Sequence, residues 1–295
     1  MKKIEQNIVL RSLAGDYTVL YNGKPVSAKA RGKLKADGGI VTGDYVTLEK
    51  DEYAKDGYVI TALKKRKNMI TRPKVSNIDQ LVIVVSVKPE PDFYLIDKLL
   101  INCVALNIEP LLVINKEDIS SEDFIKDVTA QYKEVTDILC CSGKTGQGVD
   151  ELRVRLSGKL SVFAGQSAVG KSTLLNAISS ELKLATGGLS EKTSRGRHTT
   201  RECQIYLIDD MMIADTPGFS MLDLENIEPK DLSSFFIDFD EYRGNCRYSD
   251  CSHIGTTSKE CGVKKAVEEG LISPKRYERY IDLYKELKKA WDNKF

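Results

Sequence analysis

The sequence lacks a long hydrophobic segment. None of the apolar runs in its 295 residues approaches the roughly 18 residues that a membrane-spanning helix needs. Residues 1–6 lead into no apolar core of the kind that a signal peptide carries. We therefore expect a cytoplasmic protein with no membrane partner.

Net charge is almost absent as well, since 44 Lys and Arg against 43 Asp and Glu leave only +1. The charges are unevenly distributed, however. Residues 1–74 contain 16 basic and 8 acidic side chains, whereas residues 75–224 contain 15 and 21. A basic first quarter favours a polyanionic partner, nucleic acid before others. A solvated basic face without such a partner is the open alternative.

Disulfide bonds are not expected among the seven cysteines, because a cytoplasmic compartment keeps thiols reduced. Four of the cysteines lie in core-like segments and are interpreted as packing residues: Cys103, Cys140, Cys141 and Cys203. The other three lie near a histidine within 16 residues: Cys246, Cys251, His253 and Cys261. Three sulfurs and one imidazole form a closed tetrahedral set, which is typical of structural rather than catalytic zinc.

The first 70 residues show short β-strand patterns separated by turns, with strands expected at 7–10, 17–21, 45–48 and 57–61. Strands of this spacing fit a small barrel of the OB type. Seven basic residues would edge its nucleic-acid face: Arg31, Lys33, Lys35, Lys64, Lys65, Arg66 and Lys67. Tyr17, Tyr21 or Tyr45 could stack on bases. A place in the barrel core is an equally good interpretation of these tyrosines.

After a linker at Arg72-Pro73 the pattern changes to alternating strands and helices. The expected strands are 81–87, 111–114, 137–141, 160–164, 204–208 and 211–214, and the expected helices are 93–106, 121–133, 148–156 and 173–178. The first strands are continuous apolar runs, as in strands buried on both faces. This alternation predicts a parallel sheet with helices on both faces. A further helix is expected at 274–293.

A phosphate-binding loop follows the strand at 160–164. Its residues match G-x-x-x-x-G-K-[ST]: Gly165, Gln166, Ser167, Ala168, Val169, Gly170, Lys171 and Ser172, with Thr173 next. Backbone N–H groups of such a loop, and the helix that begins near Lys171, point at phosphate oxygens. We expect Lys171 to reach the β- and γ-phosphates and Ser172 to bind Mg²⁺.

Two loops predict that the base is guanine. Asn115, Lys116 and Asp118 form an N-K-x-D sequence directly after a predicted strand. Asp118 could accept hydrogen bonds from N1–H and the exocyclic amine of guanine, which adenine does not offer together. Ser142 and Gly143 begin a loop after the next strand that is similar to the S-A-K loop of GTPases, with glycine in place of alanine.

Two further segments supply residues for Mg²⁺ and the γ-phosphate. The polar stretch 191–201 includes His198, Thr199 and Thr200, and either threonine hydroxyl could ligate Mg²⁺. Asp215 and Gly218 form a D-x-x-G sequence, in which the aspartate joins the Mg²⁺ shell and the glycine N–H meets the γ-phosphate. The whole set indicates GTP rather than ATP.

The order of these motifs is unusual, because N-K-x-D precedes the phosphate-binding loop. This permuted order, the N-terminal barrel, the sequence from 196 to 200 and the Cys/His cluster occur together in one family. The chain resembles the bacterial ribosome small-subunit-dependent GTPases of the RsgA/YjeQ type over nearly its whole length. The resemblance implies an OB-type RNA-binding domain (1–72), a circularly permuted α/β P-loop GTPase domain (73–224) and a mostly helical zinc-binding domain (225–295).

The resemblance also implies a monomer that binds GTP and GDP with Mg²⁺, holds one structural zinc, and contacts the small ribosomal subunit and its rRNA. Hydrolysis would be stimulated by that subunit in its late maturation. Phe219 follows D-x-x-G, where Ras-like enzymes have a water-orienting glutamine. We expect His198 to orient the water instead, with contact to RNA or solvent as its alternative. A nucleotide-gated RNA-binding checkpoint and a GTPase acting on a protein partner are the other hypotheses.

Overall fold

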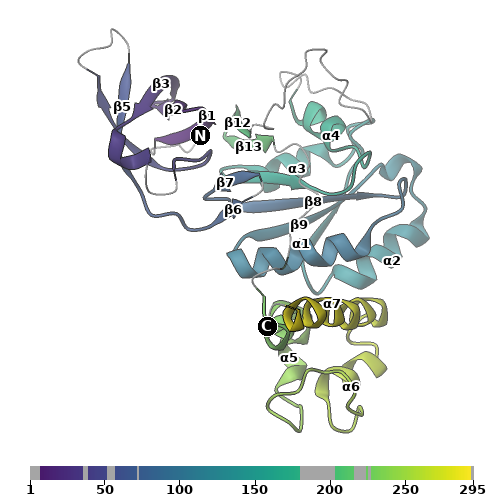
Figure 1. Ribbon diagram of the computed structural model, residues 1–295. Helices are drawn as coiled ribbons and strands as arrows, with labels where there is room; N and C mark the ends of the chain where they lie inside the picture. The colour runs from purple at the N-terminus through teal and green to yellow at the C-terminus, as the bar shows by residue number, and fades with distance from the viewer. Residues whose placement is uncertain are drawn as a thin grey trace.

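The first five strands form a small barrel in the computed structural model, which describes residues 7–35, 39–51, 57–71, 73–179, 203–215, 224 and 227–293 (Figure 1). The strands are β1 (Ile8–Leu13), β2 (Asp16–Tyr21), β3 (Lys24–Ala30), β4 (Val46–Lys50) and β5 (Tyr58–Leu63). They pair in the order β1-β2-β3-β5-β4, and residues 43–46 pair back onto β1. This order closes a five-stranded barrel of the OB type. β3 lies outside the strands that the sequence predicted.

Side chains that the sequence placed on the barrel face have mixed roles. Tyr17 is only 7% exposed and packs in the barrel core, so its core interpretation is confirmed. Arg66 donates from Nε to Asp44 Oδ1 over 2.6 Å and from Nη2 to Asp44 Oδ2 over 2.7 Å. This pairing with Asp44 raises the pKa of the guanidinium. Arg66 is therefore engaged within the protein, whereas Lys64 and Lys65 are exposed.

The barrel is attached to the rest of the chain by buried polar contacts. Two short strands, β6 (Met69–Thr71) and β7 (Lys74–Ser76), pair where the sequence predicted a linker. Ser76 Oγ donates to Asp44 Oδ1 over 2.6 Å, and Thr42 Oγ1 donates to the carbonyl of Cys203 over 3.1 Å. β1 also pairs with β12 through Arg11 and Gln204. The barrel and the central sheet are thus hydrogen-bonded to each other.

The central sheet follows the order β10-β9-β8-β11-β13-β12. Its strands are β8 (Gln80–Ser86), β9 (Glu109–Asn115), β10 (Asp137–Cys140), β11 (Leu160–Ala164), β12 (Gln204–Ile208) and β13 (Met211–Asp215). Five of them are parallel, but β12 runs antiparallel to β13, so the expectation of a wholly parallel sheet is wrong. A tight reversal at Asp209-Asp210 joins the two strands, and a hairpin can only pair antiparallel.

Helices cover both faces of this sheet, as the sequence predicted (Figure 1). α1 (Phe93–Leu106) and α2 (Glu122–Tyr132) lie on one face, and α3 (Val149–Leu156) and α4 (Lys171–Ile178) on the other. The two faces have separate apolar cores, because alternate residues of the buried strands point to opposite sides. Ile83 belongs to the first core and Val84 to the second.

The C-terminal part packs beneath α1 and α2 (Figure 1). It contains 3₁₀ turns at Pro229–Phe235 and Ile237–Phe239, and the helices α5 (Asp240–Arg243), α6 (Gly262–Glu268) and α7 (Pro274–Asp292). Ile101 of α1 is part of its apolar core. Asp97 of α1 is fully buried and forms ion pairs with Arg276 and Arg279 of α7. Arg276 also pairs with Asp238 over 2.8 Å, so the buried charges balance.

Candidate functional site

The phosphate-binding loop connects β11 to α4, which is the strand–loop–helix arrangement that the motif requires. Gly170, the last residue before α4, has a φ of +95°. A Cβ at this position would lie 2.3 Å from Nδ2 of Asn115, so only glycine fits. Val169 is buried, whereas Ser167 and Ala168 are exposed at the tip of the loop. The loop therefore closes directly against the N-K-x-D segment.

Lys171 begins α4 and folds back along the loop. Its Nζ donates to the carbonyl oxygens of Gly165 and Gln166, each over 2.6 Å. Burial lowers the pKa of this ammonium group. Ser172 and Thr173 follow in the first turn of α4, where free backbone N–H groups and the helix dipole favour an anion. This end of the helix can hold phosphate groups.

The predicted guanine loops meet the phosphate-binding loop at the carboxyl edge of the sheet. Asn115 Nδ2 donates to the carbonyl of Val169 over 2.8 Å, and its Oδ1 accepts from Gly143 N over 3.1 Å. One buried amide thus ties three loops together. Lys116 Nζ donates to the carbonyl of Ala168 over 2.8 Å and to that of Lys88 over 2.6 Å.

Asp118 is oriented by Ser142, whose Oγ donates to Asp118 Oδ1 over 2.7 Å. Ser142 Oγ also accepts from the backbone N–H of Thr145 over 3.2 Å, and the serine is fully buried. A carboxylate held in this way presents its remaining lone pairs to a base that carries two adjacent donors. The geometry therefore suits guanine, and Ser142 fixes the position of the Asp118 carboxylate.

Position 143 requires glycine because the backbone there lies close to α4. A Cβ at position 143 would lie 2.8 Å from the backbone N of Leu174 and 3.0 Å from Thr173 C. Gly143→Ala should push the loop away from α4, destabilise the fold by about 1–3 kcal/mol and weaken GDP binding. Urea unfolding and GDP titration measure both effects. Gly244→Ala is the control, because a Cβ there meets nothing within 4 Å. Equal behaviour of the two variants would contradict this account.

The residues expected to face Mg²⁺ and the γ-phosphate are only partly described. Asp215 ends β13, which is parallel to β11, so its backbone reaches the same sheet edge as the phosphate-binding loop. Gly218, Phe219, His198, Thr199 and Thr200 lie outside the described residues. Their roles stay predictions.

The Cys/His cluster forms a compact donor set in the C-terminal part. The ligand atoms of Cys246, Cys251, His253 and Cys261 all lie within 4.8 Å of one another. Cys246 Sγ lies 3.8 Å from Cys261 Sγ, and each sulfur is 3.5 Å from Nδ1 of His253. A tetrahedral zinc with the usual bond lengths gives S···S separations of about 3.8 Å and S···N separations of about 3.6 Å. The donors therefore fit a closed tetrahedral metal site.

Groups around the four donors keep the imidazole neutral and hold the donors in place. Burial, helped by Arg243, lowers the pKa of His253 to about 4, so the imidazole is neutral at pH 7. Backbone N–H groups of His253 and Lys264 point at Cys251 Sγ (3.4 Å) and Cys261 Sγ (3.5 Å). Tyr277 of α7 donates to the carbonyl of His253 over 2.5 Å and so fixes the loop. Such outer contacts are typical of structural metal sites.

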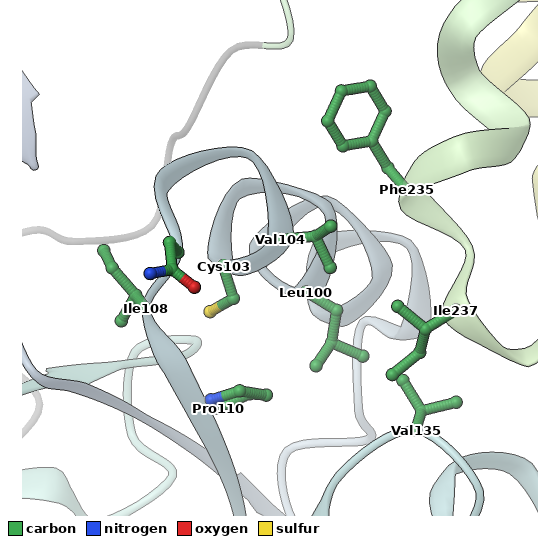
Figure 2. A pocket seen from close by; sticks show the side chains of 9 residues that line it. Leu100, Cys103, Val104, Ile108, Pro110, Val135, Phe235 and Ile237 are labelled. Atoms are coloured by element: carbon green, nitrogen blue, oxygen red, sulfur yellow. The ribbon is translucent and has the colours of Figure 1, made fainter.

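The remaining cysteines behave as predicted from the sequence. Cys103, Cys141 and Cys203 are buried, Cys140 is half-buried, and all seven cysteines are free of disulfide bonds. Cys103 lines an apolar cavity of about 270 Å³ between α1, β9 and residues 235–237 (Figure 2). None of the predicted nucleotide or metal residues lines this cavity. In the described part of the chain no helix is long and apolar enough to cross a bilayer.

Comparison with known proteins decides the family. The family model described as RsgA GTPase matches residues 63–225, more than half of the chain. The chain belongs to the RsgA GTPase family. Its activity is therefore GTP hydrolysis, and the motif order around the sheet is that of a circularly permuted GTPase. Within the central sheet, β8, β9 and β10 precede the phosphate-binding loop and lie on one side of β11, whereas β12 and β13 follow the loop and lie on the other side.

RsgA relatives match the chain over nearly its whole length. The small ribosomal subunit biogenesis GTPase RsgA of Thermotoga maritima is 42% identical over 271 residues, covering 90% of each chain. The protein of that name from Caldanaerobacter subterraneus is 38% identical and covers 98% of this chain and 97% of its own. Among solved structures, YjeQ from Thermotoga maritima superposes with a TM-score of 0.82 at 37% identity, covering 96% of this chain and 98% of its own. YloQ, a circularly permuted GTPase, gives 0.79 at 30% identity, covering 97% and 95%.

Sequence reasoning missed one part of the RsgA nucleotide site. Lys88 and Asp92, in the loop between β8 and α1, bond to Lys116 and Gln166 respectively. No GTPase motif includes them. The signal was an aspartate directly before the helix at Phe93, placed at the carboxyl end of a buried strand. Ends of parallel strands at this edge converge on the ligand site.

Proposed function

We propose that the chain is a cytoplasmic, monomeric GTPase that binds the small ribosomal subunit and its rRNA during late maturation, and that the subunit stimulates its GTP hydrolysis. The observation that carries this proposal is the near full-length similarity to relatives named as small ribosomal subunit biogenesis GTPases. The exposed Lys64 and Lys65 on the basic barrel support an rRNA contact. Co-sedimentation with purified small and large subunits tests it, and equal binding to both would overturn it.

The proposed units are an RNA-binding barrel (1–72), the GTPase domain (73–224) and a zinc-binding domain (225–295). In the GTPase domain, Asp118 selects guanine, and Lys171 with the backbone of the phosphate-binding loop holds the phosphates. Mg²⁺ would be held by Ser172, Asp215 and one of the threonines Thr199 and Thr200, and it would neutralise charge on the β- and γ-phosphates. The Cys/His cluster would hold one Zn²⁺ with no open position.

The basic barrel gives a salt-dependent prediction. Replacing Lys64 and Lys65 by alanine should weaken binding to small subunits, because each phosphate contact that is lost removes about one unit from the slope of log K against log salt. Lys126 and Lys133 of the α2 region are the matched control, because they are exposed lysines distant from the barrel. Sedimentation at several salt concentrations measures the slope. An unchanged slope for the barrel variant would favour a protein partner over RNA.

His198 is the proposed water-orienting residue, because Phe219 cannot take that role. His198→Ala should lower the small-subunit-stimulated turnover about 10²-fold or more, while the affinity for GDP stays unchanged. His198→Gln, which can still orient a water, should recover part of the rate. Assays of GTP hydrolysis at saturating GTP, with samples quenched at successive times, measure the turnover rate. Full stimulated turnover of the alanine variant would leave His198 as an RNA or solvent contact.

A further inference from the structure

The loop between β8 and α1 touches the nucleotide site at two points. At its beginning, the carbonyl of Lys88 accepts from Lys116 Nζ over 2.6 Å. At its end, the backbone N–H of Asp92 donates to Oε1 of Gln166 over 2.9 Å. The first contact involves Lys116 of the N-K-x-D sequence, and the second involves the phosphate-binding loop. Residues 88–92 therefore contact both the N-K-x-D segment and the phosphate-binding loop.

These contacts close a ring of hydrogen bonds. Lys116 Nζ donates to Ala168 as well as to Lys88, and Ala168 lies two residues beyond Gln166 in the phosphate-binding loop. The ring thus runs from Gln166 to Asp92, along the loop to Lys88, through Lys116 to Ala168, and back. Gln166 provides the direct side-chain contact on the phosphate side. Without it, the loop would lose this bond to the phosphate-binding loop and would keep the bonds that Lys88 accepts from Lys116 and Ser86.

The side chain of Gln166 also supports the start of α1. Asp92 is the N-cap residue of α1, and its Oδ1 accepts from the N–H of Leu95 over 2.9 Å. The N–H of Asp92 itself points out of the helix and finds its acceptor in Gln166. N–H groups at a helix start need partners outside the helix. The position of α1 and the position of the phosphate-binding loop are therefore linked by one amide oxygen.

We propose that Gln166 is a positioning residue for guanine nucleotides: its side-chain oxygen holds the 88–92 loop, and with it Lys116, against the phosphate-binding loop. The inference rests on the proposed use of Lys116 and this loop for GTP. Because Oε1 is bonded to a backbone amide, Gln166 acts on affinity rather than on the attacking water. GDP and GTP should depend on this side chain equally, because its oxygen bonds to the 88–92 loop, whereas the group that accepts from Lys171 is the backbone carbonyl of Gln166, which substitution leaves in place.

The test compares Gln166→Met, which has similar length but no oxygen, with Gln166→Glu, which keeps an acceptor. Three quantities are measured on the isolated full chain: Kd for GDP and for a non-hydrolysable GTP analogue, hydrogen exchange of residues 92–96, and the single-turnover rate at saturating GTP. Thermal melts of both variants show whether each is folded. None of these measurements involves ribosomes, so failure of the proposed ribosomal function would not affect the result.

For Gln166→Met we expect Kd values for GDP and the GTP analogue to rise equally, about five- to tenfold, which corresponds to one lost hydrogen bond. Exchange at residues 92–96 should become faster, and the single-turnover rate should change less than twofold. Gln166→Glu should keep slow exchange at these residues. A tenfold slower single turnover with unchanged Kd would place Gln166 in the chemical step and overturn the proposal. Unchanged Kd and unchanged exchange in the methionine variant would also overturn it.

Discussion

Cys261→Ser is expected to unfold the C-terminal part and abolish its binding of zinc. Cys261 is 1% exposed, offers one of the four candidate ligand atoms and belongs to the apolar core that also includes Phe239 and Tyr280. Structural zinc in small domains contributes roughly 10–16 kcal/mol of apparent binding free energy at pH 7. The segment that carries the four donors has little regular structure of its own, because α5 and α6 are short. Removal of the metal with a chelator should have the same effect.

Zinc content, near-ultraviolet circular dichroism and limited proteolysis measure this loss. The five tyrosines and one tryptophan of residues 225–295 make the dichroism sensitive to packing there. Cys140→Ser is the matched control, because Cys140 is a half-buried cysteine outside the cluster. A Cys261→Ser protein that retained zinc and resisted proteolysis like the parent would show that the cluster does not hold the metal.

Asp118→Asn should weaken GTP binding by two orders of magnitude or more. The carboxylate is expected to accept two charge-assisted hydrogen bonds from guanine, each contributing about 1.5–3 kcal/mol. Ser142 Oγ would still donate to Oδ1 of the asparagine, so the loop should keep its conformation. The asparagine NH₂ would then face the exocyclic amine of guanine, donor against donor.

Xanthosine triphosphate provides the rescue for this variant. Xanthine has a carbonyl in place of the guanine amine, and the asparagine NH₂ can donate to it. Titration of GTP and xanthosine triphosphate into the parent and the variant measures the change in base preference, from guanine to xanthine. Glu117→Gln, a neighbouring substitution of the same chemical kind, should leave both affinities unchanged. A variant that bound GTP as tightly as the parent would contradict the role of Asp118 in selecting the base.

Much of the nucleotide site could be predicted from the sequence because it depends on local patterns. The strand at Leu160–Ala164 and the helix at Phe93–Leu106 have the predicted bounds, since apolar runs and an N-cap aspartate define them within a few residues. Asn115, at the end of one predicted strand, reaches the phosphate-binding loop after another, because the ends of parallel strands meet at one edge of the sheet. A motif of fixed residue types at the end of a strand therefore predicts the local geometry of the site as well as its residues.

Contacts between distant segments could not be predicted in this way. Asp97 and Arg276 are 179 residues apart, and each by itself looks like an ordinary exposed helix residue. Arg66 belonged to a basic run whose other members face solvent, but a buried aspartate 22 residues earlier binds it. The antiparallel strand β12 has the same kind of apolar pattern as the parallel strands of the sheet, so the pattern does not show its direction. The burial of these charged residues and the direction of β12 depend on partners that are distant in the sequence, and no local sequence pattern identifies those partners.

The central claim is that the small ribosomal subunit stimulates GTP hydrolysis by this chain. The most direct test measures the rate of GTP hydrolysis by the purified chain alone, with purified small subunits, and with purified large subunits. We predict slow turnover alone and with large subunits, and a rate at least tenfold higher with small subunits. A rate that is the same in all three conditions, or one that large subunits raise equally, would contradict the account.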